Sequence, residues 1–318
     1  MINKSVVVIG GGTGVFSVLT GLKKYPYSLS AIVSMSDDGG STGVLREEFG
    51  TLPPGDIRRA LVALSATDNK IVSELFNYRF KSKGSLSGHS LGNLLLTALE
   101  KITGSFDQAV KEAVKILNVQ GQVIPVTLKP TSLYAELEDG KVIKGETNID
   151  IPKHDGSEKI KSVFLKPSVS ANPEALEAIK HADVVIIGPG DLYTSILPNL
   201  ITKDIVKAIS NTKAKVVYIV NIMTKYGETY GFKASNFISV IEDHLGKGVV
   251  DYCVINTELP TGTILARYAQ DKEEPVLFDR DEFGKNVQVV TGDFLRKGTY
   301  LRHNPQKLAK ALSKIIED

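Results

Sequence analysis

The sequence predicts an α/β fold of the doubly wound type, with a mostly parallel, Rossmann-like sheet and a small β-rich insertion. Residues 6–9 form an unbroken β-branched run, which is typical of a strand buried on both faces of a parallel sheet. Similar apolar runs at 29–35, 182–187, 215–220 and 252–256 alternate with stretches of helical spacing. This alternation of strand and helix patterns is the signature of a parallel sheet covered by helices.

A glycine-rich turn follows the first predicted strand. Four of the five residues 10–14 are glycines, and a helical pattern begins directly after them, at 15–24. A strand, a glycine turn and a helix N-terminus together aim backbone N–H groups at one point, where a phosphate binds. The fingerprint G-x-G-x-x-G is only partly matched, because Val15 or Ser17 takes the third glycine position. The turn therefore indicates a nucleotide or phosphorylated ligand, or else a tight turn alone.

Two adjacent carboxylates, Asp37 and Asp38, follow the second predicted strand. In a dinucleotide-binding fold, an acidic residue roughly 20 positions past the glycine turn takes the ribose hydroxyls. The pair can also bind Mg²⁺ while Ser41 and Thr42 hold phosphate oxygens. The alternative is a β-turn in which the Asp side chains accept hydrogen bonds from their own loop backbone.

Polar residues also precede two predicted helices. Asp56 is the expected N-cap of a helix that carries Arg58 and Arg59 in its first turn. Cations at that end oppose the helix dipole, so they indicate a nearby anion unless they are simply solvated. His89 precedes the next helix, at 94–102, either as an acid/base or phosphate ligand or as a capping residue.

Composition excludes several functional classes. Lys and Arg number 38 against 36 Asp and Glu, so the net charge of +2 gives no electrostatic case for nucleic acid or an anionic membrane. The sole cysteine, Cys253, lies in an apolar run and is expected to be buried. We expect a cytoplasmic protein, because no secretory leader and no spanning segment of about 18 apolar residues is found. The motifs of triad hydrolases, zinc proteases and P-loop NTPases do not occur.

The expected organisation is one large domain with an insertion. Residues 1–120 and 168–318 would form the nucleotide-binding α/β domain, and residues 121–167 a β-rich insertion or cap, because short period-two runs alternate there with turns. The strands at 182–187 and 215–220 again end in glycines, hydroxyls or Asn. Ligands bind at the carboxyl ends of strands in such sheets, so these loops are expected to share one site.

Several motifs together resemble the YvcK proteins, also called gluconeogenesis factors. In chain order they are Gly10-Gly11-Gly12-Thr13-Gly14, Asp37-Asp38-Gly39-Gly40-Ser41-Thr42-Gly43, Pro53-Pro54-Gly55-Asp56-Ile57-Arg58, Gly88-His89-Ser90-Leu91-Gly92-Asn93, 188–200 and Asn221-Ile222-Met223-Thr224. The likeness spans nearly the whole chain. The YvcK proteins belong to a superfamily with CofD, the 2-phospho-L-lactate transferase of deazaflavin-coenzyme synthesis.

The resemblance implies a cytoplasmic regulatory protein that binds UDP-sugars, UDP-N-acetylglucosamine in particular. It also implies a role in cell shape and in growth on gluconeogenic carbon sources, with protein partners in cell-wall control. No catalytic residue and no required cofactor are expected, with Mg²⁺ at Asp37 and Asp38 as an option. A homo-oligomer is expected; the apolar faces of several predicted helices fit either a dimer contact or the core alone.

The resemblance, together with the loops described above, implies a set of ligand-binding residues. They are Gly11, Gly12, Thr13, Gly14, Asp37, Asp38, Gly39, Gly40, Ser41, Arg58, Asn93, Gly188, Pro189, Gly190, Tyr193, Thr194, Ser195, Asn199, Asn221, Tyr268 and Arg302. Tyr268 and Arg302 match a Tyr and an Arg-His pair implicated in sugar-nucleotide binding in the family. Asn304 stands where Asp usually follows that pair, which argues against an acid/base or metal role at this position.

Two other functions remain open at this point. A Mg²⁺-dependent transferase like CofD would join a phosphorylated small acid to a nucleotide, with Asp37 and Asp38 holding the metal. A dehydrogenase of the NAD type is the generic alternative for a glycine turn after a first strand.

Overall fold

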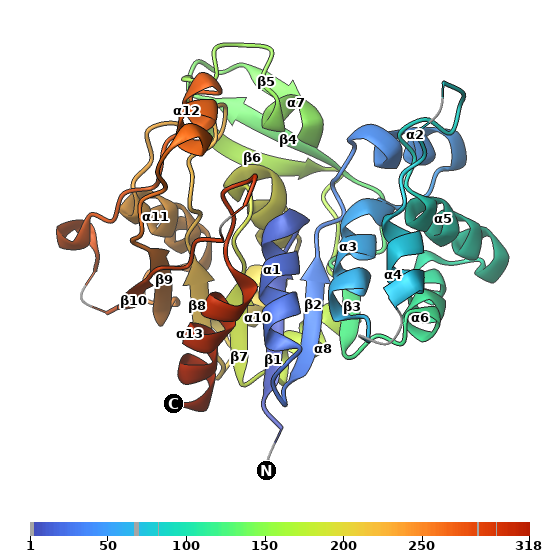
Figure 1. Cartoon of the computed structure of the whole chain (residues 1–318), viewed down its shortest axis with the longest axis horizontal. Coiled ribbons are helices and arrows are strands. Elements are labelled where there is room, and N and C mark those ends of the chain that lie inside the picture. Colours follow the sequence, from blue (N-terminus) through green and yellow to red (C-terminus); the bar gives the residue numbers. More distant parts are fainter. Residues whose placement is uncertain (1–2, 67–69, 82, 285, 297) are drawn as a thin grey trace.

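The computed structural model describes residues 3–66, 70–81, 83–284, 286–296 and 298–318. A seven-stranded parallel sheet, in the order β10-β9-β8-β7-β1-β2-β3, crosses the molecule (Figure 1). Its strands are β1 (Ser5–Gly10), β2 (Ser28–Val33), β3 (Gln122–Pro125), β7 (Val184–Ile187), β8 (Lys215–Ile219), β9 (Tyr252–Asn256) and β10 (Gln288–Gly292). The predicted doubly wound α/β fold is confirmed.

The central strand β1 is buried because both of its neighbours are strands and helices cover both faces. Val6 pairs in register with Leu29 of β2 on one side and with Val184 of β7 on the other. Val6, Val7, Val8 and Ile9 have no solvent-exposed surface. The unbroken β-branched run is thus explained by a position at the centre of a parallel sheet.

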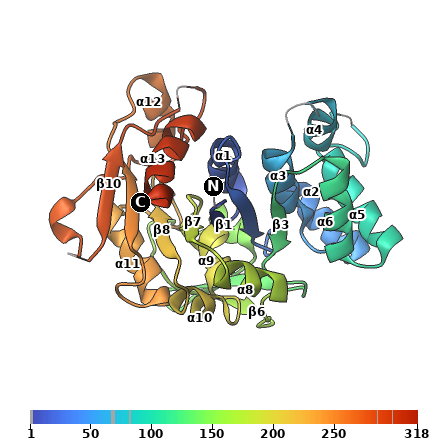
Figure 2. The same cartoon turned by 90° about the horizontal axis from the view of Figure 1, so that it is seen from below.

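The strand order reverses direction at β1. From β1 the chain adds β2 and then β3 on one side, and later adds β7, β8, β9 and β10 in turn on the other. The helix that follows β1 and the helices that follow β7 therefore lie on opposite faces of the sheet, so the pair β1 and β7 forms a topological switch point (Figure 2). Such a switch point is the place where ligands bind in open α/β sheets.

Helices form layers on both faces of the sheet (Figure 2). On one face α1 (Gly12–Leu22) packs against α3 (Pro54–Leu64) and α13 (Pro305–Glu317). The other face carries α8 (Pro173–Lys180), α10 (Ile205–Ser210) and α11 (Ala234–Leu245), which pack in sequence. Beyond the β3 edge lie α2 (Gly40–Phe49), α4 (Lys70–Asn77), α5 (Leu91–Thr103) and α6 (Phe106–Ile116).

Shorter helices follow the strands and their loops. They are α7 (Glu146–Asp150), the π-helix η1 (Leu192–Ile196), α9 (Leu197–Leu200), α12 (Thr263–Gln270) and the 3₁₀ turn η2 (Arg280–Glu282). Among the described residues, none of the helices is both long and apolar enough to cross a bilayer.

The insertion is a three-stranded antiparallel sheet, β5-β4-β6, that lies with α7 above the carboxyl edge of the main sheet (Figure 1). Its strands are β4 (Ser132–Leu137), β5 (Val142–Lys144) and β6 (Ile160–Lys166). One boundary differs from the prediction, because the first run assigned to the insertion is β3, which pairs in parallel with β2. Val123 and Ile124 are both buried, as in a strand covered on two faces, so the short run did not alternate as a hairpin strand would.

Two local predictions also need correction. The segment 37–43, expected to be a loop, enters α2 at Gly40, and Gly50 ends that helix in the left-handed conformation at φ 65°. Asp56 lies in the first turn of α3 rather than at its N-cap, because Pro53 is the N-cap and Pro54 begins the helix. Cys253 is fully buried, as predicted.

Candidate functional site

Two adjoining cavities open at the switch point between β1 and β7. The α1 cavity, of about 280 Å³, is bounded by the N-terminus of α1 and by Asn221, Tyr268 and Arg302. The acidic cavity, of about 260 Å³, is bounded by Asp37, Asp56, Glu146, Asp150 and Asp191. Both are also lined by Gly12, Thr13, Asp191 and Ser195, so they form one continuous cleft.

The N-terminus of α1 faces this cleft without a capping side chain. Gly11 is the N-cap residue and makes no side-chain cap hydrogen bond. Gly12 has φ +64°, which only glycine adopts without strain. The first N–H groups of the helix are thus available to an anion, and the positive end of the helix dipole favours one there.

Gly14 is required because α1 comes very close to the loop after β7. A Cβ atom at Gly14 would lie 1.6 Å from the carbonyl oxygen of Pro189. Gly190, the next residue of that loop, donates its N–H to Asn221 Oδ1 at 3.3 Å. The loop after β7 therefore contacts both α1, which follows β1, and the segment after β8. The side-chain nitrogen of Asn221 can still donate a hydrogen bond at the α1 cavity.

The helix on the β7 side differs, because a protein carboxylate occupies its N-terminus. Glu228 is buried and accepts hydrogen bonds from the Tyr193 N–H at 2.9 Å and the Thr194 hydroxyl at 2.8 Å. Burial, and next the nearby Asp191 and Asp150, raise the pKa of Glu228 to about 8. The N-terminus of η1 is consequently not free for a ligand's phosphate, whereas that of α1 is.

Tyr268 and Arg302 form the outer wall of the α1 cavity. The Tyr268 hydroxyl accepts the N–H of Leu301 at 3.1 Å, which fixes the backbone just before Arg302. The exposed Arg302 guanidinium lies 5.2 Å from the ring centre of Tyr300, in cation–π geometry. Its neighbour His303 is buried, which lowers its pKa to about 4, so that imidazole is neutral at pH 7.

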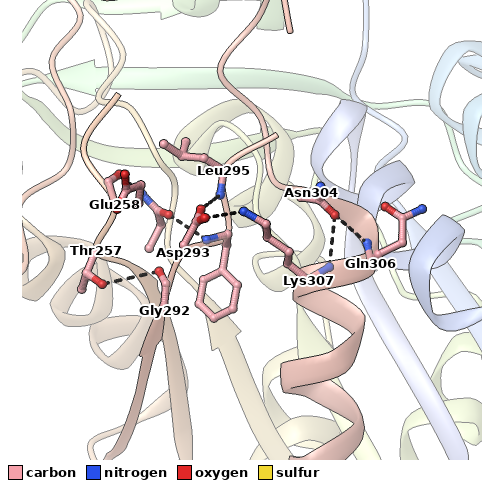
Figure 3. A network of polar contacts seen from close by, with 10 residues as sticks. Thr257, Glu258, Gly292, Asp293, Leu295, Asn304, Gln306 and Lys307 are labelled. Carbon is pink, nitrogen blue, oxygen red and sulfur yellow. Dashed lines mark hydrogen bonds and ion pairs between the residues drawn. The ribbon is translucent and has the colours of Figure 1, made fainter. Parts of the chain in front are cut away.

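Asn304 continues this wall as the N-cap of α13 (Figure 3). Its Oδ1 accepts the N–H groups of Gln306 at 3.0 Å and Lys307 at 3.1 Å. Lys307 also pairs with Asp293, which ties the start of the helix to the end of β10. Asn and Asp cap helices about equally well. Asn304 therefore caps α13 as the Asp usual in the family would, and the segment that carries Arg302 is held in the same way.

The acidic cavity concentrates carboxylates in a small volume. Burial, and next the charge of Asp56, raise the pKa of Asp37. Burial, and next the charge of Asp37, raise the pKa of Glu146 to about 9. Arg59 offsets part of this charge through its ion pair with Asp56 at 2.9 Å.

Three carboxylates in this region are close enough to share a cation. Oxygen atoms of Asp150, Asp191 and Glu228 all lie within 4.8 Å of one another. Lys225 already supplies one positive charge, since its ammonium lies 2.9 Å from Asp150. A hard divalent cation such as Mg²⁺ fits this set of oxygen donors.

Asp37 and Asp38, the predicted metal pair, have different surroundings. Asp37 borders the acidic cavity. The Asp38 carboxylate instead accepts the backbone N–H groups of Glu146 at 3.2 Å and Thr147 at 2.9 Å, at the start of α7. Asp38 thereby holds the insertion, and with it Glu146, against the rim of the cleft.

Another group of predicted residues forms a buried polar network away from the cavities. Ser41 Oγ lies 3.1 Å from His89 Nδ1 and accepts the Asn93 amide N–H at 3.3 Å. Arg58 Nε donates to Asn93 Oδ1 at 3.0 Å, and burial lowers the pKa of Arg58 to about 10. These contacts join α2, α3 and α5, so His89 and its neighbours serve packing in this structure.

The predicted site residues thus divide into two sets. Those that line the cleft are Gly12, Thr13, Gly14, Asp37, Pro189, Gly190, Thr194, Ser195, Asn221, Tyr268 and Arg302. Those that line neither cavity are Gly11, Asp38, Gly39, Gly40, Ser41, Arg58, Asn93, Gly188, Tyr193 and Asn199. Several of the latter support the cleft, as where the Asn199 amide donates to the Ser195 carbonyl at 2.9 Å.

Apart from Asp37, the carboxylates around the cleft were missed by sequence reasoning, and so was Lys225. Glu146 and Asp150 come from the insertion and line the acidic cavity. Lys225 and Glu273, from segments after β8 and α12, line the α1 cavity, and Glu228 lies near Asp150 and Asp191 without lining either cavity. Burial is the first cause that raises the pKa of Glu273, to about 7. The one available signal was the position of Lys225 and Glu228 close behind Asn221, in the segment that follows the carboxyl end of β8.

Comparisons with known proteins agree over almost the full chain. Residues 6–295 match the model of the family CofD, 2-phospho-L-lactate transferase CofD. The gluconeogenesis factor of Halalkalibacterium halodurans is 46% identical over 98% of this chain and 96% of its own, and that of Bacillus subtilis is 41% identical over 98% of both. A crystal structure of a UPF0052 family member from Bacillus halodurans superposes with a TM-score of 0.93 at 45% identity, over 98% of this chain and 99% of its own. The chain therefore belongs to the CofD family, in its YvcK or gluconeogenesis-factor branch.

Proposed function

We propose that the cleft binds a sugar nucleotide, UDP-N-acetylglucosamine, and that the chain acts as a regulator without turnover. The observation that carries this proposal is the uncapped N-terminus of α1, which shares a cavity with the guanidinium of Arg302. A diphosphate would accept hydrogen bonds from the α1 N–H groups on one side and pair with Arg302 on the other. Tyr268 and the side-chain amide of Asn221 also line this cavity and would contact the same ligand.

The acidic cavity suits the hydroxyl-rich part of the same ligand. Carboxylates such as Asp37 accept hydrogen bonds from ribose or sugar hydroxyls, and an acidic residue after the second strand has that role in dinucleotide-binding folds. The two cavities together, at about 280 and 260 Å³, have the size of a site for a nucleotide-sized molecule. A phosphate alone would leave most of this volume unused.

The names of the relatives suggest the physiological setting. Gluconeogenesis factors are named for carbon metabolism, so we propose that this chain supports growth on gluconeogenic carbon sources and cell morphogenesis from the cytoplasm. A UDP-sugar suits both roles, because it is made from a sugar phosphate and supplies sugar units to cell-wall synthesis. Protein partners would then respond to the loaded state.

Isothermal titration calorimetry tests the binding. We expect wild-type protein to bind UDP-N-acetylglucosamine, and Arg302→Ala to bind it about tenfold or more weakly, because a charge-assisted hydrogen bond to phosphate is lost. Arg280→Ala, in the exposed turn η2, is the matched control and should bind like wild type. Absence of heat from wild-type protein at millimolar ligand would refute the proposal.

A Mg²⁺-dependent transferase is the second candidate, and the carboxylates of Asp150, Asp191 and Glu228 favour it. These residues would hold the cation, which would supply charge neutralisation across a diphosphate. The chain's own groups would orient the phosphates through α1 and Arg302. If chelator leaves nucleotide affinity unchanged and no product forms from nucleotide and phospho-acid, this candidate fails and the binding proposal stands.

A further inference from the structure

We infer that Arg267 is a second phosphate-binding residue of the cleft, held beside Arg302 by the ring of Tyr300. This inference rests on the proposed function and gives each phosphate of the diphosphate its own guanidinium. Arg267 lies on α12, which is above the carboxyl edge of the main sheet (Figure 1). It directly precedes Tyr268, whose side chain lines the α1 cavity.

Aromatic rings hold both arginines at the mouth of the α1 cavity. The guanidinium carbon of Arg267 lies 5.0 Å from the ring centre of Tyr300 and 5.8 Å from that of Tyr268. The guanidinium carbon of Arg302 lies 5.2 Å from the ring centre of the same Tyr300. Both distances are those of cation–π contacts. The two cations thus lie beside one ring, close enough together to contact neighbouring phosphates of a single ligand.

The charges of these arginines are not balanced by the protein. Within the described part of the chain, neither Arg267 nor Arg302 forms an ion pair with a carboxylate. Arg267 donates instead to the carbonyl oxygen of Thr299, which leaves most of its five N–H donors for other acceptors. Two like charges beside one ring repel each other, and a ligand with two adjacent negative charges would neutralise both. The pair therefore favours a diphosphate over a neutral ligand.

Packing does not account for Arg267. No residue of α12 is fully buried, and the Arg267 side chain is exposed. The helix is joined to the segment before Arg302 by two hydrogen bonds, from Arg267 to Thr299 and from the Leu301 N–H to the Tyr268 hydroxyl. These bonds place Arg267 next to the cavity, but they bury no part of its charge. A charged fork held in place at a cavity mouth suits bidentate binding of phosphate.

Isothermal titration calorimetry with two ligands tests the inference. UDP-N-acetylglucosamine is the proposed ligand, and inorganic pyrophosphate carries the phosphates alone. Arg267→Met keeps the length of the side chain without its charge and should weaken binding of both ligands about tenfold. Arg280→Met, at an exposed arginine of η2, is the matched control and should leave both affinities unchanged. The circular dichroism of Arg267→Met should match that of wild type, because α12 has no buried residue.

A double substitution separates direct contact with phosphate from support of Arg302. If Arg267 binds phosphate itself, Arg267→Met should weaken pyrophosphate binding about tenfold in the Arg302→Ala background as well. No further loss in that background would show that Arg267 acts only through Arg302, and would overturn the inference. Tyr300→Phe keeps the ring and should bind like wild type, whereas Tyr300→Ala releases both guanidiniums and should bind several-fold more weakly.

The two ligands also distinguish this inference from the proposed function. If pyrophosphate binds, more weakly to Arg267→Met, but UDP-N-acetylglucosamine does not bind, the proposed ligand is wrong and the inference stands. If UDP-N-acetylglucosamine binds wild type and Arg267→Met equally, the inference is overturned and the proposed function stands. Weaker binding of UDP-N-acetylglucosamine with unchanged binding of pyrophosphate would also overturn the inference, because Arg267 would then contact the base or the sugar.

Discussion

Gly14→Ala tests whether the close contact between α1 and the β7 loop builds the cleft. Intrinsic helix propensity favours Ala over Gly by about 1 kcal/mol inside a helix, so propensity alone predicts stabilisation. The new Cβ, however, would lie 1.6 Å from the Pro189 carbonyl oxygen and 2.4 Å from its carbonyl carbon. Both atoms are backbone, so no side chain can turn away, and α1 or the loop must move by more than about 1 Å to reach a normal C···O separation.

Overpacking of this kind costs about 1–3 kcal/mol, with rigid backbone at the upper end. We therefore expect Gly14→Ala to lower the free energy of unfolding by about 2 kcal/mol net, measured from the urea midpoint by circular dichroism. Gly190→Ala is the matched control, because its Cβ would meet no atom closer than 3.3 Å and should cost less than about 1 kcal/mol. A Gly14→Ala variant as stable as wild type, with unchanged ligand affinity, would refute this account of the switch point.

Further predictions concern the carboxylates of the cleft. Asp38→Ala removes the acceptor for two N–H groups of α7 and should cost about 1–2 kcal/mol in urea unfolding, whereas Asp38→Asn should retain more of that stability. Glu146, with its pKa raised to about 9 from 4.5, keeps a proton that the unfolded chain releases, so stability should fall as pH rises from about 5 to 9, by at most ~1.4 kcal/mol per pH unit. Glu146→Gln should flatten that slope, and an unchanged slope would contradict the assignment. Lys225→Met leaves Asp150 without its ion-pair partner and should cost about 3 kcal/mol at pH 8 but less at pH 5, where the neighbouring Glu228, with its pKa raised to about 8, is protonated.

The sequence predicted the parts of the fold that depend on local pattern. The four β-branched side chains of residues 6–9 predict a strand that is buried on both faces, and β1 is such a strand at the centre of the sheet. The α1 side of the cleft was predictable for a related reason, since Thr13, Gly190 and Asn221 directly follow strands, and the carboxyl ends of parallel strands share one edge.

The acidic side could not be predicted, because it depends on how the insertion folds back. Glu146 reaches Asp37 across more than a hundred residues, through the hydrogen bonds that Asp38 makes to the start of α7. No spacing in the sequence encodes such a contact. Conversely, Ser41 and Asn93 lie in small, polar, glycine-rich segments of the kind that binds ligands, yet the Asn93 amide donates to the Ser41 hydroxyl. Buried polar groups need hydrogen-bond partners in any packed layer, so such residues also occur where no ligand binds.

The contrast between two helix N-termini determines how a ligand would be oriented. Both α1 and η1 point toward the switch point, but Glu228 already places a carboxylate at η1. A phosphate there would have to displace Glu228 from the Tyr193 N–H and the Thr194 hydroxyl, whereas at α1 it meets helix N–H groups without a capping side chain and Arg302. We therefore expect the diphosphate to bind at α1. A hydroxyl-bearing ring would then extend over Thr13 toward Asp37, because neutral donors satisfy carboxylates that a second anion would repel.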